Sequence, residues 1–190
     1  MDILKEIFLM QQTYATLFSL TNKLQIHGDQ YLGRLTARQF MAMMAIGHLP
    51  ENETTLNNIA RKLGTSKQSA KQLITIIEKK GYVITVPSPQ DKRAVNVKIT
   101  EAGKEVLIEA AEKGLFFLEE LFKHFTTEEM ETLWSLLKKL YRYDGEEQDG
   151  FEEESRVEVS EDYSETQTRI LKEFETRRQA RQKERTNNEK

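Results

Sequence analysis

Residues 56–100 read LNNIARKLGTSKQSAKQLITIIEKKGYVITVPSPQDKRAVNVKIT, and this stretch decides the fold. Apolar side chains recur at helical spacing over 56–63, and a glycine then forces a tight turn. A second helix is predicted for 67–80, because Ser66 is a favoured type of helix N-cap and Gly81 a favoured type of helix stop. Two short helices joined by a tight turn indicate a helix-turn-helix.

The hydrophobic period changes from 3.6 to 2 after Gly81, as expected for a β-hairpin. Apolar side chains alternate with their neighbours around 83–85 and again over 95–99. The tip between them, residues 87–93, contains two prolines and ends in a lysine and an arginine. Because the prolines keep this tip out of a sheet and stiffen it, the pattern predicts a hairpin wing with a positively charged end.

Helices are predicted on both sides of this stretch. The first spans about residues 2–24, and the second spans 37–48 with Thr36 as its N-cap. Thr100 caps a long helix with a heptad-like apolar seam, and a last helix begins at Thr127. These outer helices have broad apolar faces and no sheet to cover them, so they need a partner surface.

The expected fold is therefore mainly α with a small β-hairpin wing, a winged helix-turn-helix flanked by N- and C-terminal dimerisation helices. We divide the chain into four parts, which are an N-terminal dimerisation helix in 1–34, a DNA-binding lobe in 35–100, C-terminal dimerisation helices in 101–143 and a tail in 144–190.

Composition excludes several classes of protein. The chain has 190 residues, of which 38% are hydrophobic and 31% are charged, and it has no cysteine. Disulfides, thiolate nucleophiles and cysteine-ligated metals are thereby excluded. No apolar run approaches the roughly 20 residues that a bilayer span needs, and the start lacks the pattern of a secretory signal, so we expect a cytoplasmic protein.

Charge is segregated along the chain, although the formal net charge is only -3. Residues 61–98 hold nine Lys or Arg against two acidic residues, a net charge of +7, whereas 144–165 hold eleven acidic residues against one arginine, a net charge of -10. We expect the folded unit to end near Tyr143 and the tail to be disordered or an exposed helix. The acidic block is either a solvated linker or a segment that competes with DNA or recruits a partner.

The exposed side of the second helix carries residue types that bond base edges and phosphates in a major groove. The candidate DNA-binding residues on it are Ser66, Lys67, Gln68, Ser69, Lys71, Gln72 and Thr75. At the wing tip, Lys92 and Arg93 suit an adjacent minor groove, whose narrow A·T-rich stretches attract arginine. Asp91 is expected to be structural, holding the wing turn and orienting Arg93.

In these segments the chain resembles the MarR-type (multiple antibiotic resistance regulator) transcription factors. The resemblance rests on 35–40, on 56–81 and above all on 91–103, which looks like the family's wing signature of Asp-x-Arg, alternating apolar residues, Thr and Gly. It covers residues 1 to about 143. The family often has an arginine at the wing base where this chain has Thr85, so the chain departs there from one phosphate-contacting position.

The resemblance implies a homodimer in which the first and last helices of both chains intertwine. It also implies a repressor that reads a pseudo-palindrome in double-stranded DNA and releases it when a small, often aromatic or phenolic, effector binds. The methionines near Phe8 and Phe40, namely Met10, Met41, Met43 and Met44, could line such a pocket, but their spacing favours a core role.

We expect neither an enzyme nor a metal or cofactor site. The chain lacks a Gly-rich phosphate loop and an interpretable His, Ser and Asp grouping, and His27, His48 and His124 lack the partners of a metal site. One alternative is a protein-interaction module that works through the acidic tail without specific DNA binding. Another is an activator or a nucleoid-like binder with weak sequence preference.

Overall fold

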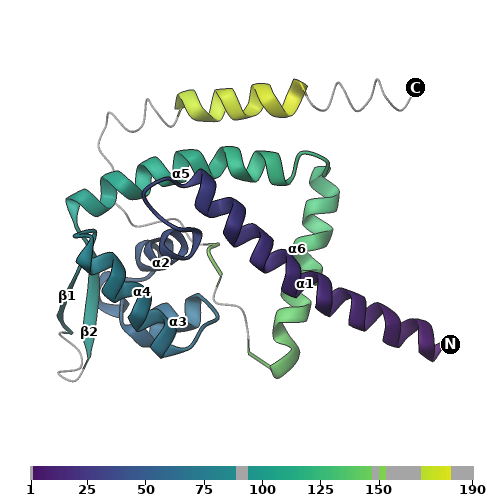
Figure 1. Cartoon of the computed structure of the whole chain (residues 1–190), viewed down its shortest axis with the longest axis horizontal. Helices are drawn as coiled ribbons and strands as arrows, with labels where there is room; N and C mark the ends of the chain where they lie inside the picture. Colours follow the sequence, from purple (N-terminus) through teal and green to yellow (C-terminus); the bar gives the residue numbers. More distant parts are fainter. Residues whose placement is uncertain (1, 89–93, 147–149, 153–167, 181–190) are drawn as a thin grey trace.

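A computed structural model describes residues 2–88, 94–146, 150–152 and 168–180 of the chain (Figure 1). Within these residues the fold is mostly helical with one two-stranded antiparallel hairpin, as predicted. The elements in chain order are α1 (Ile3–Tyr31), α2 (Ala37–His48), the one-turn helix η1 (Glu51–Glu53), α3 (Leu56–Lys62), α4 (Lys67–Lys79), β1 (Val83–Pro87), β2 (Val95–Ile99), α5 (Glu101–Leu121), α6 (Thr127–Tyr141) and the one-turn helix η2 (Arg142–Asp144). Residues 168–180 are also helical.

Three helices, α2, α4 and α5, begin at the hydroxyl caps that the sequence predicts. The Thr36 hydroxyl accepts a hydrogen bond from the Gln39 backbone N–H at 3.2 Å, and the Gln39 side chain accepts one from the Thr36 N–H at 3.3 Å. This reciprocal pair satisfies two of the N–H groups that a helix start leaves without partners. Ser66 and Thr100 cap α4 and α5 in the same way through their side chains.

Helix α1 is longer than predicted. The prediction ended it near Leu24, because the sequence is polar beyond that point, but the helix continues to Tyr31. Gly28 in this extension is buried, and a Cβ built on it would lie 3.0 Å from the Ala37 Cβ. The absent side chain lets α1 pass close to the start of α2, so tertiary packing sustains a helix that hydrophobic periodicity did not show.

The apolar core lies within the lobe formed by α2, α3, α4, the hairpin and the first half of α5. Its most deeply buried large side chains are Leu35, Met43, Ile59, Ile77, Val83, Val97 and Val106. Each helix of the helix-turn-helix packs one stripe of apolar side chains into this core. The opposite face of each helix is therefore exposed to solvent.

The hairpin is bound to the helical part at its root. β1 and β2 pair from Val83 opposite Ile99 to Pro87 opposite Val95. The prediction that placed Pro87 in the tip is therefore wrong, because Pro87 is the last residue of the first strand. A proline is tolerated there because a two-stranded sheet exposes its edge. The Val97 N–H donates to the Thr54 carbonyl at 3.0 Å, which ties the second strand to the segment before α3.

Helices α1 and α6 carry many exposed apolar side chains. The first half of α1 extends beyond the lobe, and α6 runs down the side of the molecule across α1 (Figure 1). Their exposed large side chains include Leu4, Phe8, Tyr14 and Phe18 on α1 and Trp134 and Leu137 on α6. None of the helices that the structure describes is long and apolar enough to cross a membrane.

Residues 168–180 run beside α5 (Figure 1). The Arg178 guanidinium donates to the carbonyls of Phe122 at 2.8 Å and Phe125 at 3.2 Å, and the Arg177 guanidinium lies 4.4 Å from the centre of the Phe116 ring. Ile170 is buried. The domain boundary near residue 143 stays a prediction, while these contacts bring part of the basic tail onto the surface of α5.

We predict opposite effects for two alanine substitutions in α5. A Cβ at Gly103 would lie 2.0 Å from the Tyr82 carbonyl oxygen and 2.9 Å from the Ile99 Cγ2, so Gly103→Ala should lower the free energy of unfolding by about 2–3 kcal/mol through overpacking. Gly114→Ala is the matched control, because its Cβ would meet nothing closer than the Leu32 Cδ2 at 3.7 Å. The helix propensity of alanine should leave that variant unchanged or stabilise it by up to about 1 kcal/mol. Urea unfolding measures both, and equal losses would contradict the packing at Gly103.

Candidate nucleic-acid interface and apolar pocket

Helix α4 presents most of the predicted DNA-binding residues on one exposed surface. Ala70, Ile74 and Ile77 turn into the core, which leaves the opposite face in solvent. That face carries Lys67, Gln68, Lys71, Gln72 and Thr75, all exposed, with Ser66 exposed at its start and Ser69 half-buried. The structure thus brings together amide, ammonium and hydroxyl groups, the types that pair with base edges and phosphates.

The two serines at the start of α4 are already engaged with each other. The Ser66 hydroxyl accepts a hydrogen bond from the Ser69 N–H at 3.2 Å and donates one to the Ser69 hydroxyl at 3.0 Å. An N-cap of this kind contributes about 0.5–2 kcal/mol to helix stability. Positioning the helix start is therefore the role that the geometry gives to this pair.

The turn before α4 requires its glycine. Gly64 has φ of 59°, a left-handed conformation, and the Thr65 N–H donates to the Ala60 carbonyl at 2.9 Å. A Cβ on Gly64 would lie 3.2 Å from the Tyr141 hydroxyl at the end of α6. The helix-turn-helix turn is thus both conformationally restricted and backed by the last helix of the domain.

The other end of α4 is fixed by a lysine that the sequence analysis did not single out. The Lys80 ammonium donates to the Arg34 carbonyl at 3.0 Å and to the Gln39 Oε1 at 2.9 Å. These contacts tie the last turn of α4 to the start of α2. No local sequence pattern marks this contact, because it joins residues 41 and 46 positions apart.

Thr85 has a structural role at the position where the family often has an arginine. Its backbone N–H and its hydroxyl both donate to the Glu78 Oε1, at 2.9 and 2.8 Å. Glu78 lies on α4 and Thr85 on β1, so this carboxylate joins the candidate recognition helix to the wing. Glu78 is a site residue that the sequence analysis missed.

Only the root of the wing can be described. Asp91, Lys92 and Arg93 lie outside the described residues. On the near side of the tip, the Ser88 N–H donates to the Ala94 carbonyl at 3.0 Å and closes the loop. Farther down the second strand, the Lys98 ammonium beside Glu51 lowers the pKa of that carboxyl, first by hydrogen bonding and then by charge attraction.

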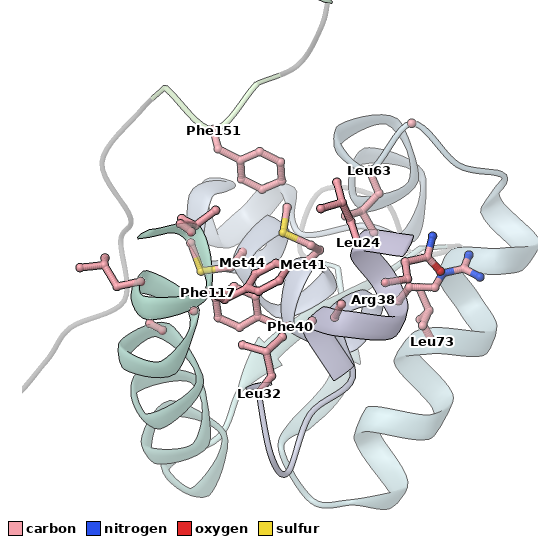
Figure 2. A pocket seen from close by; sticks show the side chains of 18 of the residues that line it. Leu24, Leu32, Arg38, Phe40, Met41, Met44, Leu63, Leu73, Phe117 and Phe151 are labelled. Atoms are coloured by element: carbon pink, nitrogen blue, oxygen red, sulfur yellow. The ribbon is translucent and has the colours of Figure 1, made fainter. Parts of the chain in front are cut away.

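An apolar pocket of about 800 Å³ lies between α1, α2 and α5, beside the start of α4 (Figure 2). Phe40, Met41 and Met44 of α2 line it. Phe40 and Met44 also pack against the core, as expected, whereas Met41 is exposed and does not belong to the core. Met43 is fully buried in the core as expected, whereas Met10 and Phe8 lie exposed on α1.

The pocket has one charged side chain among its described lining residues, that of Arg38. The remaining wall comes mainly from aliphatic and aromatic groups, among them Leu24, Leu32 and Phe117. A mainly apolar cavity of this size is large enough to enclose a small-molecule ligand.

The histidines show ordinary structural contacts. The His48 Nδ1 lies 2.8 Å from the Met44 carbonyl oxygen, a hydrogen bond within α2. Among the residues that the structure describes, no three His, Asp or Glu side chains lie close enough together to hold a metal ion.

Comparison with known proteins identifies relatives of one kind. A sequence profile of the MarR family matches residues 35–94. The transcriptional repressor MprA of Escherichia coli K12 is 29% identical over 112 residues, which are 58% of this chain and 64% of the repressor. The chain thus aligns with less than two thirds of that relative's length.

Solved structures show the same fold. A mutant MarR from E. coli complexed with operator DNA superposes with a TM-score of 0.60 and 26% identity, covering 74% of this chain and 99% of that chain. PcaV from Streptomyces coelicolor, solved in complex with its natural ligand, superposes with a TM-score of 0.61 and 13% identity, covering 67% of this chain and 90% of that one. The winged helix-turn-helix architecture is therefore shared with transcriptional regulators.

The hydrogen bond between the wing and α4 yields a stability prediction. Thr85→Val removes the hydroxyl that donates to Glu78 and should lower the free energy of unfolding by about 1 kcal/mol, as expected for loss of one hydrogen bond to a partly solvated carboxylate. Thr75→Val is the control, because the Thr75 hydroxyl only donates to the Lys71 carbonyl within the same helix. Denaturant titration measures the free energy of unfolding of both variants. A loss in Thr85→Val no larger than that in Thr75→Val would contradict a stabilising role for the contact between Thr85 and Glu78.

Proposed function

We propose that this chain, whose residues 35–94 match the profile of the MarR family, binds double-stranded DNA as a transcriptional regulator. The observation that carries the proposal is the exposed polar and cationic face of α4, on a helix held at both ends. Preorganised donors on a rigid helix are what major-groove recognition requires.

In this proposal the residues of α4 take different roles. Gln68 and Gln72 bond base edges, because a glutamine amide can pair with adenine through two hydrogen bonds. Lys67 and Lys71 reach guanine or phosphate, while Thr75 and the half-buried Ser69 lie beside them. Ser66 acts through the helix cap described above.

The wing completes the proposed interface. Arg93 enters the minor groove next to the site read by α4, Lys92 adds a phosphate contact, and Asp91 orients the Arg93 guanidinium. Thr85 does not contact DNA in this proposal. Its hydroxyl donates a hydrogen bond to Glu78 and so links the wing to α4.

The working form in this proposal is a homodimer. The exposed apolar side chains of α1 and α6 supply a self-complementary surface, since a two-fold axis uses the same patch on both copies. Two recognition helices related in this way would read half-sites of a pseudo-palindrome about one DNA turn apart. Binding at such a site within a promoter would repress transcription.

A small aromatic anion is the proposed effector. Arg38 is the one charged residue among the described residues that line the pocket, and its guanidinium suits a carboxylate or phenolate. The pocket lies between α1 and the lobe that carries α4. Occupation of this space would change how the lobe sits against the dimerisation helices and so alter DNA affinity. We propose neither catalysis nor a bound cofactor for this chain.

Selection of genomic DNA fragments by the purified chain at physiological salt tests DNA recognition. We expect a shared pseudo-palindrome. Gln68→Ala should cost about 1–3 kcal/mol at one base position, and Lys71→Ala should weaken binding to all sequences and reduce the salt slope by about 1. Lys139→Ala, a loss of one exposed charge on α6, is the matched control and should leave the selected site unchanged. Absence of any enriched sequence would favour the protein-interaction module.

Sedimentation tests the dimer separately. The double substitution Leu4→Glu with Phe8→Glu places charges on the exposed face of α1 and should raise the dissociation constant of the dimer by at least about a hundredfold, because two apolar side chains lose burial. Ile84→Glu, on an exposed position of the wing, is the control and should not change it. If the control and the double variant had the same dissociation constant, the proposal that α1 forms the dimer interface would be contradicted.

A further inference from the structure

A short piece of the tail lies against the pocket. Residues 150–152 follow the end of α6 in the chain, yet Phe151 is part of the pocket wall and packs against the buried core. Figure 2 shows the Phe151 ring above Met41 and Met44. The ring meets the His48 imidazole edge to face, with centroids 5.3 Å apart and planes at 83°.

Polar contacts hold this piece on either side of the ring. The Lys62 ammonium donates to the Gly150 carbonyl at 2.6 Å and lies 5.3 Å from the centre of the Phe151 ring. The Glu152 carboxylate lies 3.7 Å from the Lys138 ammonium. Three consecutive residues therefore contact α2, α3 and α6, and one of these contacts is to the first helix of the helix-turn-helix.

The sequence around Phe151 marks it as an anchor. Phe151 is the only aromatic residue between Tyr143 and Tyr163, in a stretch dominated by Glu and Asp. The acidic residues around this aromatic side chain offer no apolar surface on which it could pack. It can therefore be buried only against another part of the protein that receives it. Here that part is the wall of the apolar pocket and the core beside it.

The attachment is weak enough to be reversible. The Phe151 side chain is half-buried, and the Lys138 and Glu152 side chains stay 34% and 63% exposed, so that ion pair contributes little. Because a linker of about ten residues joins Phe151 to α6, the segment nonetheless acts at an effective concentration in the millimolar range.

We propose that Gly150–Phe151–Glu152 is a tethered competitor at one wall of the effector pocket, and that an aromatic anion displaces Phe151 to reach the apolar surface under its ring. This inference rests on the proposed effector pocket and specifies how it is regulated. Displacement of Phe151 breaks the contact between Lys62 and Gly150. It thereby separates α3 from residues 150–152, which also contact α6 through Glu152. The tail therefore sets the concentration of effector at which α3 loses its contact with Gly150.

Calorimetric titration of the full chain with 2-naphthoate, without DNA, tests the displacement. Phe151→Ala should bind the naphthoate about tenfold more tightly than the unsubstituted chain, because the competing occupant is gone, and Phe151→Leu should fall between them. Leu171→Ala, an exposed apolar loss on the helix 168–180, is the control and should match the unsubstituted chain. Ala111→Trp fills the pocket and should abolish binding.

Fluorine NMR of the chain with 4-fluorophenylalanine at position 151 provides a second measurement that needs no destabilising variant. Saturating naphthoate should move the signal to the position of a solvent-exposed ring. Unchanged or weaker binding by Phe151→Ala, binding that survives in Ala111→Trp, or an unmoved fluorine signal would each overturn the proposal. Operator binding is measured separately on the same variants, so loss of DNA recognition and failure of the displacement are distinguishable.

Discussion

The close approach of α5 to the root of the hairpin is the constraint on which the rest of the lobe depends. The Tyr82 carbonyl lies where a side chain on Gly103 would have to be, and the Thr100 N–H donates to that carbonyl at 3.0 Å. The Thr100 hydroxyl also donates to the Gly81 carbonyl at 2.7 Å and accepts from the Gly103 N–H. The end of α4, both strands and the start of α5 thus meet at one junction, and the direction of the wing relative to α4 follows from it.

The features that could be predicted from the sequence are those that depend on residues close together in the chain. The starts of α2, α4 and α5 were predictable because Thr36, Ser66 and Thr100 act on N–H groups within three residues of themselves. The hairpin was predictable from its alternating period, and the exposed face of α4 from its helical period. Each of these signals lies within a few residues along the chain.

Features that depend on distant segments could not be predicted. The extension of α1 depends on packing of Gly28 against Ala37, and the Lys80 contacts reach back to Arg34 and Gln39. The sequence also could not decide between a core and a pocket at Phe40, Met41 and Met44, since a stripe of Phe and Met has the same spacing whether it fills a core or lines a cavity. Such contacts join segments whose proximity is a product of the fold itself.

The contact of Arg178 with the end of α5 has a consequence for the order of folding. The carbonyls at the end of a helix need partners, and here Arg178 donates to the carbonyl of Phe122, which caps α5, and to that of Phe125 in the connection to α6, from 56 and 53 residues downstream. At 5–20 residues per second, the ribosome makes that arginine roughly 3–11 seconds after Phe122. During this interval α5 lacks the Arg178 contact, so the lobe can complete its core before the C-terminal turn of α5 is fixed.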